Sequence, residues 1–396
     1  METCKSIPVI DLQDFPGQSS KLVKACEDWG CFRIINHDKI LPFSLMKEMK
    51  AVVRSLLDLP QEIKQRNRDV IAGSGYVAPS ERNPLYEALG LYDIASSEAL
   101  DEFCTQLDAS PHQRQSFWTG QPKDLGETFV RYAQAIHKLI NDIAQKVAEG
   151  LGVANFSFEG WPCQFRINKY NFVEESVGSY GVQIHTDSGF LTILQEDENV
   201  RGLEVMDKCG TFVAVDPWPG SLIVNLGDAA TLWSNGRLHN VKHRVLCKEA
   251  TIRVSIATFL LGPREDAIEP PSQLVDSEHP RQYKPFTYEE YRKLRLSTKM
   301  QAELLAIRRL ASTVAQELLV SAWLLDVNKP APVATVSLSF FSILVLPEPL
   351  INSFQQTAKA LHIPKSVHQE VEVSSLGSRW LSTHDFQLYG SKCADI

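Results

Sequence analysis

Hydrophobic positions recur with two different spacings along the chain. Before residue 160, apolar residues repeat every three or four positions within residues 19–29, 41–59 and 114–151, which predicts helices with one buried face. In the last of these helices the repeat runs through Ala133, Ile136, Ile140, Ile143 and Val147. Residues 7–12 and 31–37 are short apolar runs that predict two strands in the same part of the chain.

From residue 164 the spacing changes to two. Eight strand-like runs are separated by turn residues, and they cover residues 165–172, 182–185, 189–195, 203–206, 212–215, 222–226, 242–247 and 251–261. Such a series predicts an antiparallel sandwich or jelly roll, in which two sheets enclose a cavity. After residue 283 a helical pattern returns, and Thr287 and Glu290 have the spacing of a capping box. We therefore expect a mixed α/β (α+β) protein with a β core between helical segments.

These patterns divide the chain into five segments. We expect an N-terminal region of strands and helices at 1–110, a long helical segment at 111–160, a β-rich core at 161–265 and a C-terminal helix at 266–300. Residues 301–396 differ in composition and carry no motif that we can interpret. We expect a chain that ends near Met300 to keep its activity.

The composition narrows the classes of protein to consider. With 44% hydrophobic and 22% charged residues, the chain of 396 residues is typical of globular proteins. Its net charge of −8 provides no overall basic surface, so we expect neither a nucleic-acid nor a membrane partner. The eight cysteines form no C-x-x-C pair, which argues against a zinc site of paired cysteines. We find no secretory signal and no apolar stretch of spanning length, so a cytoplasmic location is expected.

Three residues of the β-rich window have the side chains of a metal site. His185 and Asp187 are two positions apart, so on a strand both face the same side. His243 follows 56 positions after Asp187, at the start of another apolar strand. Two imidazoles and one carboxylate form the three-ligand set of a non-haem Fe(II) and leave coordination positions open. The sequence therefore predicts a metal site at these three residues.

Two other placements of the ligands remain open. His239 is an alternative third ligand, although the residues before it, 235–238, are typical of a turn. His368 and Glu370 repeat the spacing of the first pair, but no strand with a His and then an Arg-x-Ser follows them. We favour the set that contains His243 for these reasons.

Two polar pairs in the same window suit a carboxylate ligand. Arg253 and Ser255 alternate on one predicted strand, and Asn168 and Tyr170 alternate on another. A guanidinium beside a hydroxyl binds a carboxylate through charge-assisted hydrogen bonds. We expect residues 245–255 to form a hairpin that sets Arg253 opposite Leu246, ~10 Å deeper than the start of the strand at residue 243. A five-carbon diacid bridges such a gap, with one end on the metal and the other on the arginine.

The order of these motifs resembles that of the plant-type 2-oxoglutarate- and Fe(II)-dependent dioxygenases, whose pattern is H-x-D, a distant H, and then R-x-S. Residues 8–12 and 29–37 are similar to the N-terminal region of that family, with Asp38 in place of a usual glycine. Residues 225–228 are similar to its core turn, where we expect Asp228 to be a turn or buried hydrogen-bonding residue rather than a ligand. Residues 160–170, 188–195, 233–245 and 259–263 are similar to the auxin-oxidising branch of the family.

The resemblance, which covers about residues 5–300, implies a double-stranded β-helix (jelly roll, cupin-like) core and a catalytic Fe(II) held by His185, Asp187 and His243. It implies 2-oxoglutarate as cosubstrate, bound by the two polar pairs above with Arg253 on its C5 carboxylate, and O2 as the second cosubstrate. Ascorbate is implied as a reductant. The implied reaction converts indole-3-acetic acid to 2-oxindole-3-acetic acid and releases succinate and CO2.

Other functions stay open at this stage. An oxygenase of the same family acting on a gibberellin or a flavonoid, a non-catalytic jelly-roll binding protein, and an oxidase that works without 2-oxoglutarate are the alternatives. The complete ligand set together with the two polar pairs disfavours the last two. Four aromatic residues are candidate walls for an indole, namely Tyr76, Phe172, Phe190 and Phe259. The sequence does not indicate an oligomeric state.

Overall fold

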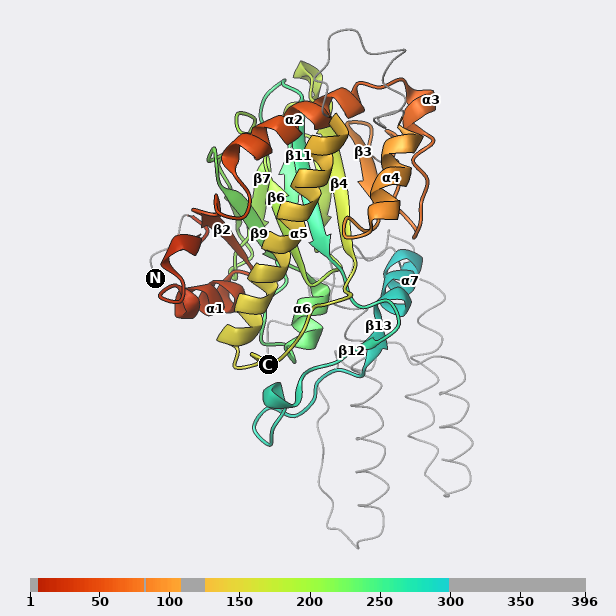
Figure 1. The fold of residues 1–396 in the computed structure, drawn as a ribbon. Coiled ribbons are helices and arrows are strands. Elements are labelled where there is room, and N and C mark those ends of the chain that lie inside the picture. The colour runs from red at the N-terminus through yellow and green to blue at the C-terminus, as the bar shows by residue number, and fades with distance from the viewer. Residues whose placement is uncertain (1–5, 82, 108–124, 299–396) are drawn as a thin grey trace, which may run out of the picture. The chain divides into compact units, whose positions relative to one another are not determined.

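The computed structural model describes residues 6–81, 83–107 and 125–298, and Figure 1 shows their arrangement. The chain divides into two compact units, Met1–Ala322 and Trp323–Ile396, and all the described residues belong to the first. The segment predicted at 301–396, with the His368/Glu370 pair, lies outside the described residues. No helix of the described part is long and apolar enough to cross a membrane.

The β core consists of two sheets, as the eight predicted runs indicated. The larger has seven strands in the order β1 (Val9–Asp11), β2 (Cys31–Ile35), β9 (Leu222–Leu226), β6 (Leu191–Gln195), β11 (Arg253–Leu260), β4 (Cys163–Tyr170) and β3 (Tyr86–Leu91). The smaller has four strands in the order β5 (Tyr180–His185), β10 (His243–Leu246), β7 (Leu203–Met206) and β8 (Phe212–Ala214). Apart from the parallel pair β1–β2, neighbouring strands are antiparallel. A separate ladder joins β12 (Ala267–Ile268) to β13 (Phe286–Thr287).

The predicted hairpin at residues 245–255 is wrong. Strand β10 pairs with β5 and β7 in the smaller sheet, whereas β11 pairs with β4 and β6 in the larger one. Residues 247–252 therefore carry the chain from one sheet to the other. Arg253 consequently does not extend the strand that begins at His243, and the depth that we derived from the hairpin does not apply.

Seven α-helices surround or connect the described strands, and their bounds are α1 (Ser19–Asp28), α2 (Phe43–Leu57), α3 (Gln61–Lys64), α4 (Ser97–Gln106), α5 (Leu125–Gly150), α6 (Asp228–Trp233) and α7 (Tyr288–Thr298). Three short 3₁₀ turns lie at Leu12–Asp14, Glu174–Ser176 and Ser272–Leu274. Helix α5 packs on strands β6 and β11 and is flanked by α1 and α2, so these helices cover one face of the larger sheet (Figure 1). The predicted repeat on α5 is confirmed, because Ile136, Ile140 and Ile143 are buried in this layer.

Each face of the larger sheet belongs to a different hydrophobic core. On β9, Leu222, Val224 and Leu226 pack into the cluster shared with the helices, while Ile223 belongs to a second cluster between the sheets. This second cluster also contains Val205 of the smaller sheet. Burial on both faces explains why β9 reads as an almost continuous apolar run. The space between the sheets that the second cluster leaves open holds the site described next.

Candidate active site

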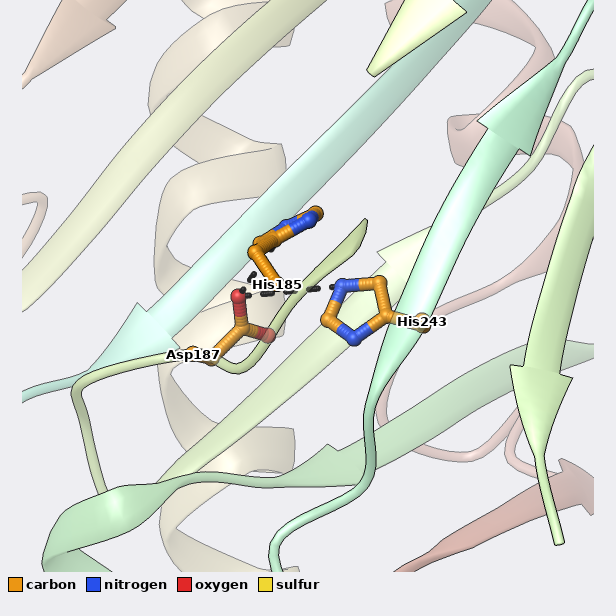
Figure 2. Close-up of side chains that lie close together, drawn as sticks. All are labelled: His185, Asp187 and His243. Atoms are coloured by element: carbon orange, nitrogen blue, oxygen red, sulfur yellow. Dashed lines mark ion pairs between the residues drawn. The ribbon is translucent and has the colours of Figure 1, made fainter. Parts of the chain in front are cut away.

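His185, Asp187 and His243 meet at one point between the sheets (Figure 2). His185 is the last residue of β5 and is the direct cross-strand partner of His243, the first residue of β10. Their ring centroids are 4.1 Å apart. The Nε2 atom of each histidine lies 3.8 Å from Oδ1 of Asp187, and the three ligand atoms all lie within 4.8 Å of one another. The predicted set is therefore brought together.

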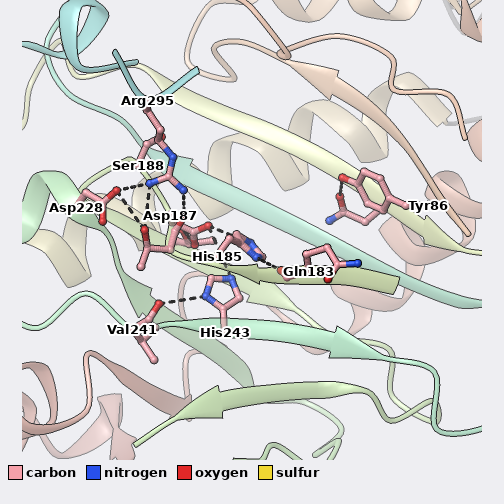
Figure 3. Close-up of polar contacts among 12 residues, drawn as sticks. Tyr86, Gln183, His185, Asp187, Ser188, Asp228, Val241, His243 and Arg295 are labelled. Carbon is pink, nitrogen blue, oxygen red and sulfur yellow. Dashed lines mark hydrogen bonds and ion pairs between the residues drawn. The ribbon is translucent and has the colours of Figure 1, made fainter. Parts of the chain in front are cut away.

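Hydrogen bonds hold each ligand in the orientation that a metal requires. Nδ1 of His185 donates to the carbonyl oxygen of Gln183 at 2.8 Å, and Nδ1 of His243 donates to that of Val241 at 3.3 Å (Figure 3). Both Nε2 atoms therefore carry a lone pair toward the carboxylate. The second oxygen of Asp187, Oδ2, accepts a hydrogen bond from Thr192 at 2.6 Å, which leaves Oδ1 facing the two imidazoles.

The protonation states also suit a metal. Burial, with a contribution from the neighbouring His243, lowers the pKa of His185 to about 4. Burial alone raises the pKa of Asp187, but the two histidines and the hydrogen bond from Thr192 outweigh it, so the net shift of this pKa is downward. A neutral imidazole and an ionised carboxylate result near neutral pH. Two imidazole nitrogens and one carboxylate oxygen are the donor set that binds non-haem Fe(II), so these residues fit that ion.

The alternative ligands are not part of this cluster. Within the described residues, His185, Asp187 and His243 are the only three metal-binding side chains that converge on one point. His239 lies between α6 and β10, where its backbone N–H donates to the carbonyl oxygen of Cys26. His243, and not His239, is therefore the histidine that joins His185 and Asp187 in the cluster.

The H-x-D spacing predicted that Asp187 lies on the same strand as His185, but Asp187 lies outside that strand. Strand β5 ends at His185, and Asp187 follows in a segment, Thr186–Ser188, that we call the ligand loop. Arg295 of helix α7 donates to both the carbonyl oxygen and Oγ1 of Thr186, the latter at 3.1 Å (Figure 3). The ligand loop is therefore held by a helix rather than by a neighbouring strand.

Asp228 connects the ligand loop to helix α7. Its backbone N–H donates to the carbonyl oxygen of Asp187 at 2.8 Å, and its carboxylate accepts hydrogen bonds from Tyr291 and Arg295 of α7. Asn240, three residues before His243, donates to the other carboxylate oxygen at 2.5 Å. Asp228 is 2% exposed, so the expectation of a buried hydrogen-bonding residue outside the ligand set is confirmed.

The two polar pairs lie on adjacent strands of the larger sheet, in matching register. Arg253 of β11 is opposite Tyr170 of β4, and Ser255 is opposite Asn168. The Arg253 guanidinium lies 5.1 Å from the centroid of the Tyr170 ring. Nδ2 of Asn168 donates to Oγ of Ser255 at 3.4 Å. The pairs predicted from alternation therefore form one polar patch.

Arg253 is prepared to bind an anion. It is 1% exposed, and among the described residues its Nε and Nη1 atoms have no hydrogen-bond partner. A buried guanidinium with unmade hydrogen bonds is unfavourable unless a negatively charged ligand pairs with it. The buried guanidinium nitrogens that lack partners in the described part of the chain therefore fit a ligand carboxylate bound beside Arg253.

One cavity of about 490 Å³ contains both the metal-ligand cluster and the polar patch, a volume typical of small-molecule sites. Its walls are formed by Asn83, Tyr86, Arg166, Asn168, Tyr170, Val182, Gln183, His185, Asp187, Thr192, Leu194, Asn225, His243, Val245, Arg253, Ser255, Ala257, Phe259, Arg295 and Leu296. Of the four candidate aromatic walls, Phe259 lines the cavity. Phe190 instead packs among buried aromatic rings, Phe172 belongs to the core between the sheets, and Tyr76 donates to Glu87.

Tyr86 and Arg295 are among the cavity residues that the sequence did not predict. Tyr86 of β3 donates to Oδ1 of Asn168 at 2.8 Å, and Arg295 comes from α7 (Figure 3). The sequence placed no element at residues 86–91 and read residues 288–298 as a helix without a role in the site. Neither residue has a neighbour in the sequence that marks it as functional, so no local signal pointed to them.

Comparison with known proteins supports the same chemistry. Residues 161–262 match the 2OG-Fe(II) oxygenase superfamily, and residues 7–102 match the N-terminal region described as non-haem dioxygenase in morphine synthesis. The rice (Oryza sativa) 2-oxoglutarate-dependent dioxygenase DAO is 55% identical over 298 residues, which are 74% of this chain and 95% of the rice protein.

Two solved structures are similar in both sequence and fold. The crystal structure of the rice dioxygenase for auxin oxidation has 53% identity and a TM-score of 0.69, and the match covers 77% of this chain and all of that one. The binary complex of dioxygenase for auxin oxidation 1 from Arabidopsis thaliana with 2-oxoglutarate has 56% identity and a TM-score of 0.64. That match covers 69% of this chain and all of the Arabidopsis chain.

Proposed function

The chain belongs to the 2-oxoglutarate- and Fe(II)-dependent oxygenase superfamily, and on this premise we propose that it oxidises indole-3-acetic acid to 2-oxindole-3-acetic acid. The substrate is taken from the relatives that are 53–56% identical and are named for auxin oxidation. The observation that carries the enzymatic part is the pairing, in one cavity, of the metal-ligand cluster with the buried Arg253. A gibberellin or flavonoid substrate has no comparable support.

The residues of the site have distinct roles in this proposal. His185, Asp187 and His243 hold Fe(II), which when bound supplies the oxidation of the substrate by O2 coupled to conversion of 2-oxoglutarate to succinate and CO2. Arg253 and Ser255 bind the C5 carboxylate of 2-oxoglutarate.

The walls of the cavity complete the site. Asn168, itself oriented by Tyr86, and Tyr170 confine the cosubstrate beside the arginine. The sheets shield Asp187 and His243 from bulk water, since both are buried, whereas the side chain of His185 is 25% exposed. We include ascorbate as the reductant and the cytoplasm as the location in the proposal.

Product analysis tests the proposal directly. The purified protein is incubated with indole-3-acetic acid, Fe(II), ascorbate and 2-oxoglutarate, and the products are identified by mass. We expect the substrate to gain one oxygen atom and succinate to form in equal amount, with neither product when 2-oxoglutarate is omitted. Asp187→Ala, which removes one ligand, is the inactive control.

The alternatives give different results in the same assay. Succinate formed with a gibberellin or a flavonoid, but not with indole-3-acetic acid, contradicts the proposed substrate and keeps the family chemistry. A non-catalytic binding protein releases no succinate with any substrate. It also lacks the absorption band that Fe(II) and 2-oxoglutarate give together under anaerobic conditions.

A further inference from the structure

The cavity continues along the larger sheet beyond the polar patch. Alternate residues of β4 line it, so Arg166 lies on the same face of the strand as Asn168 and Tyr170. Arg166 and Tyr170 are four positions apart on an antiparallel strand, so their Cα atoms are separated by ~13 Å. Because Tyr170 is the cross-strand partner of Arg253, the cavity has a guanidinium at each end of this wall.

The wall around Arg166 has room and an aromatic surface. Its cross-strand partner on β11 is Ala257, whose small side chain fills little of the cavity. Phe259 follows two residues later on the same face and also lines the cavity. Leu296 of α7, which is 52% exposed, also lines the cavity. An apolar, aromatic wall beside a cation suits a flat aromatic anion.

Besides Arg253, two arginines of the described chain line the cavity, Arg166 and Arg295, and they differ in their ion pairs. Arg295 is paired with Asp228 and hydrogen-bonded to Thr186. Arg166 forms no ion pair with a described residue, and both of its hydrogen bonds there use Nη2, to the carbonyl oxygens of Gly73 at 2.6 Å and Gly75 at 3.1 Å. Its positive charge is therefore not matched by a carboxylate of the described protein, although the residue lies on a cavity wall.

We propose that Arg166 pairs with the carboxylate of the substrate while Phe259 packs against its aromatic ring. The proposal rests on the proposed function, and it narrows the substrate class to flat aromatic monocarboxylates. Arg253 binds the carboxylate of the cosubstrate at one end, so the second anion requires a second cation at a different place. Arg166 meets this need and makes the enzyme prefer the acid over a neutral analogue of the same shape.

The test compares indole-3-acetic acid with indole-3-acetamide, its uncharged analogue. The ratio of their kcat/KM values is measured for the wild-type protein, Arg166→Gln and Arg166→Lys. Loss of a charge-assisted hydrogen bond weakens binding by about 10- to 100-fold. We expect Arg166→Gln to lower kcat/KM for the acid by that factor and to change the value for the amide little. Arg166→Lys keeps the charge and retains part of the preference.

Arg292 provides the matched control. Its guanidinium holds the same loop as Arg166, donating from Nε to the carbonyl oxygen of Ala72 at 3.1 Å, but it is not among the residues that line the cavity. Arg292→Gln therefore weakens the support of the loop without removing the charge from the cavity. We expect its preference for the acid to match that of the wild-type protein. In each variant the KM for 2-oxoglutarate and the anaerobic Fe(II)/2-oxoglutarate absorption report an intact cosubstrate end.

The outcomes separate the two proposals. If the wild-type protein leaves indole-3-acetic acid unchanged, the proposed function fails and the role of Arg166 fails with it. If the wild-type protein oxidises the acid and Arg166→Gln keeps the full preference, or Arg292→Gln loses it equally, only the role of Arg166 is overturned. Should Arg166→Gln be insoluble, Arg166→Lys decides: a reduced ratio together with a wild-type KM for 2-oxoglutarate supports the role of Arg166, and an undiminished ratio refutes it.

Discussion

Replacing Asp228 by asparagine removes the negative charge that joins helix α7 to the ligand loop. The side chain keeps its size, but an amide has one acceptor oxygen in place of two. Asp228 now accepts hydrogen bonds from Asn240 on one oxygen and from Tyr291 and Arg295 on the other. The variant therefore leaves the guanidinium of Arg295, whose side chain is 14% exposed, without its carboxylate partner.

The size of the effect follows from burial. Removing one partner of a buried ion pair costs about 3–5 kcal/mol, because the other charge stays desolvated. Arg295 still donates to the carbonyl oxygen of Thr186, so we expect the lower end, about 3 kcal/mol. For a large domain this lowers Tm by about 6 to 12 °C. The carboxylate of Asp228 also anchors Arg295, which holds the ligand loop at Thr186, and loss of such support weakens metal binding by about 10- to 100-fold.

Thermal unfolding and Mn(II) titration followed by electron paramagnetic resonance measure the two effects. Glu289→Gln is the control, because Glu289 is an exposed carboxylate of the same helix that pairs with Lys293 at 2.7 Å. Such exposed pairs contribute less than about 1 kcal/mol. The reasoning is refuted if Asp228→Asn loses no more stability than the control and binds Mn(II) as the wild-type protein does.

Three further changes have defined outcomes. Arg253→Gln raises the KM for 2-oxoglutarate by about 10- to 100-fold in steady-state assays, because it removes the charge-assisted contact; an unchanged KM contradicts the assignment. At Glu204, burial raises the pKa, but hydrogen bonds from Lys248 at 2.6 Å and Arg244 at 2.7 Å outweigh it and lower the pKa below 4.5. The stabilisation by Glu204 is therefore full above about pH 4.5 and is lost as pH falls through the folded-state pKa. In urea unfolding, Glu204→Gln is therefore less stable than wild type at neutral pH, and the two free energies of unfolding converge in acid. A chain ending at residue 300 keeps its activity in the product assay, and loss of soluble, active protein contradicts this.

Local pattern predicted the strands of the β core, most clearly in the larger sheet, where strands such as β6 and β9 are buried on both faces. The runs at residues 203–206 and 222–226 match β7 and β9 in both bounds, and the other six core strands differ from their predicted runs by a few residues at the ends. A strand between two packed layers needs apolar residues on each face and polar turns at each end. These requirements appear in the sequence itself, so no knowledge of the strand's partners was needed.

Strand β3 was missed because its partner decides its structure. The segment Tyr86–Leu91 contains Glu, Ala and two Leu, which favour helix, and a Gly, which favours neither helix nor strand. It is a strand because it pairs along its length with β4, some 80 residues later. Tyr86 enters the cavity through this pairing. A residue placed by a long-range partner gives no signal within its own segment.

Residues of the site were predicted to the extent that chemistry restricts their type and spacing. A facial metal site requires His and carboxylate ligands, and the predicted three converge as expected. Arg295, by contrast, follows His243 by 52 residues on a helix with many charged residues. Nothing in the sequence favoured Arg295 over Arg292 or Lys293 of the same helix as a site residue. Packing of α7 against the ligand loop selects Arg295, and that packing is a tertiary property.

The order of the motifs along the chain follows from the nesting of strand pairs. Strands β4 and β11 pair in the larger sheet and carry the polar patch, while β5 and β10 lie between them in the sequence and pair in the smaller sheet. The inner pair is thus folded over the outer pair, and the eleven residues from His243 to Arg253 include the crossing between the sheets. A simple hairpin would have placed the arginine in the same sheet as the two histidines, ~10 Å along the strands from His243. Nesting places it on the opposite sheet across one cavity, which is the arrangement that a diacid bound at both ends requires.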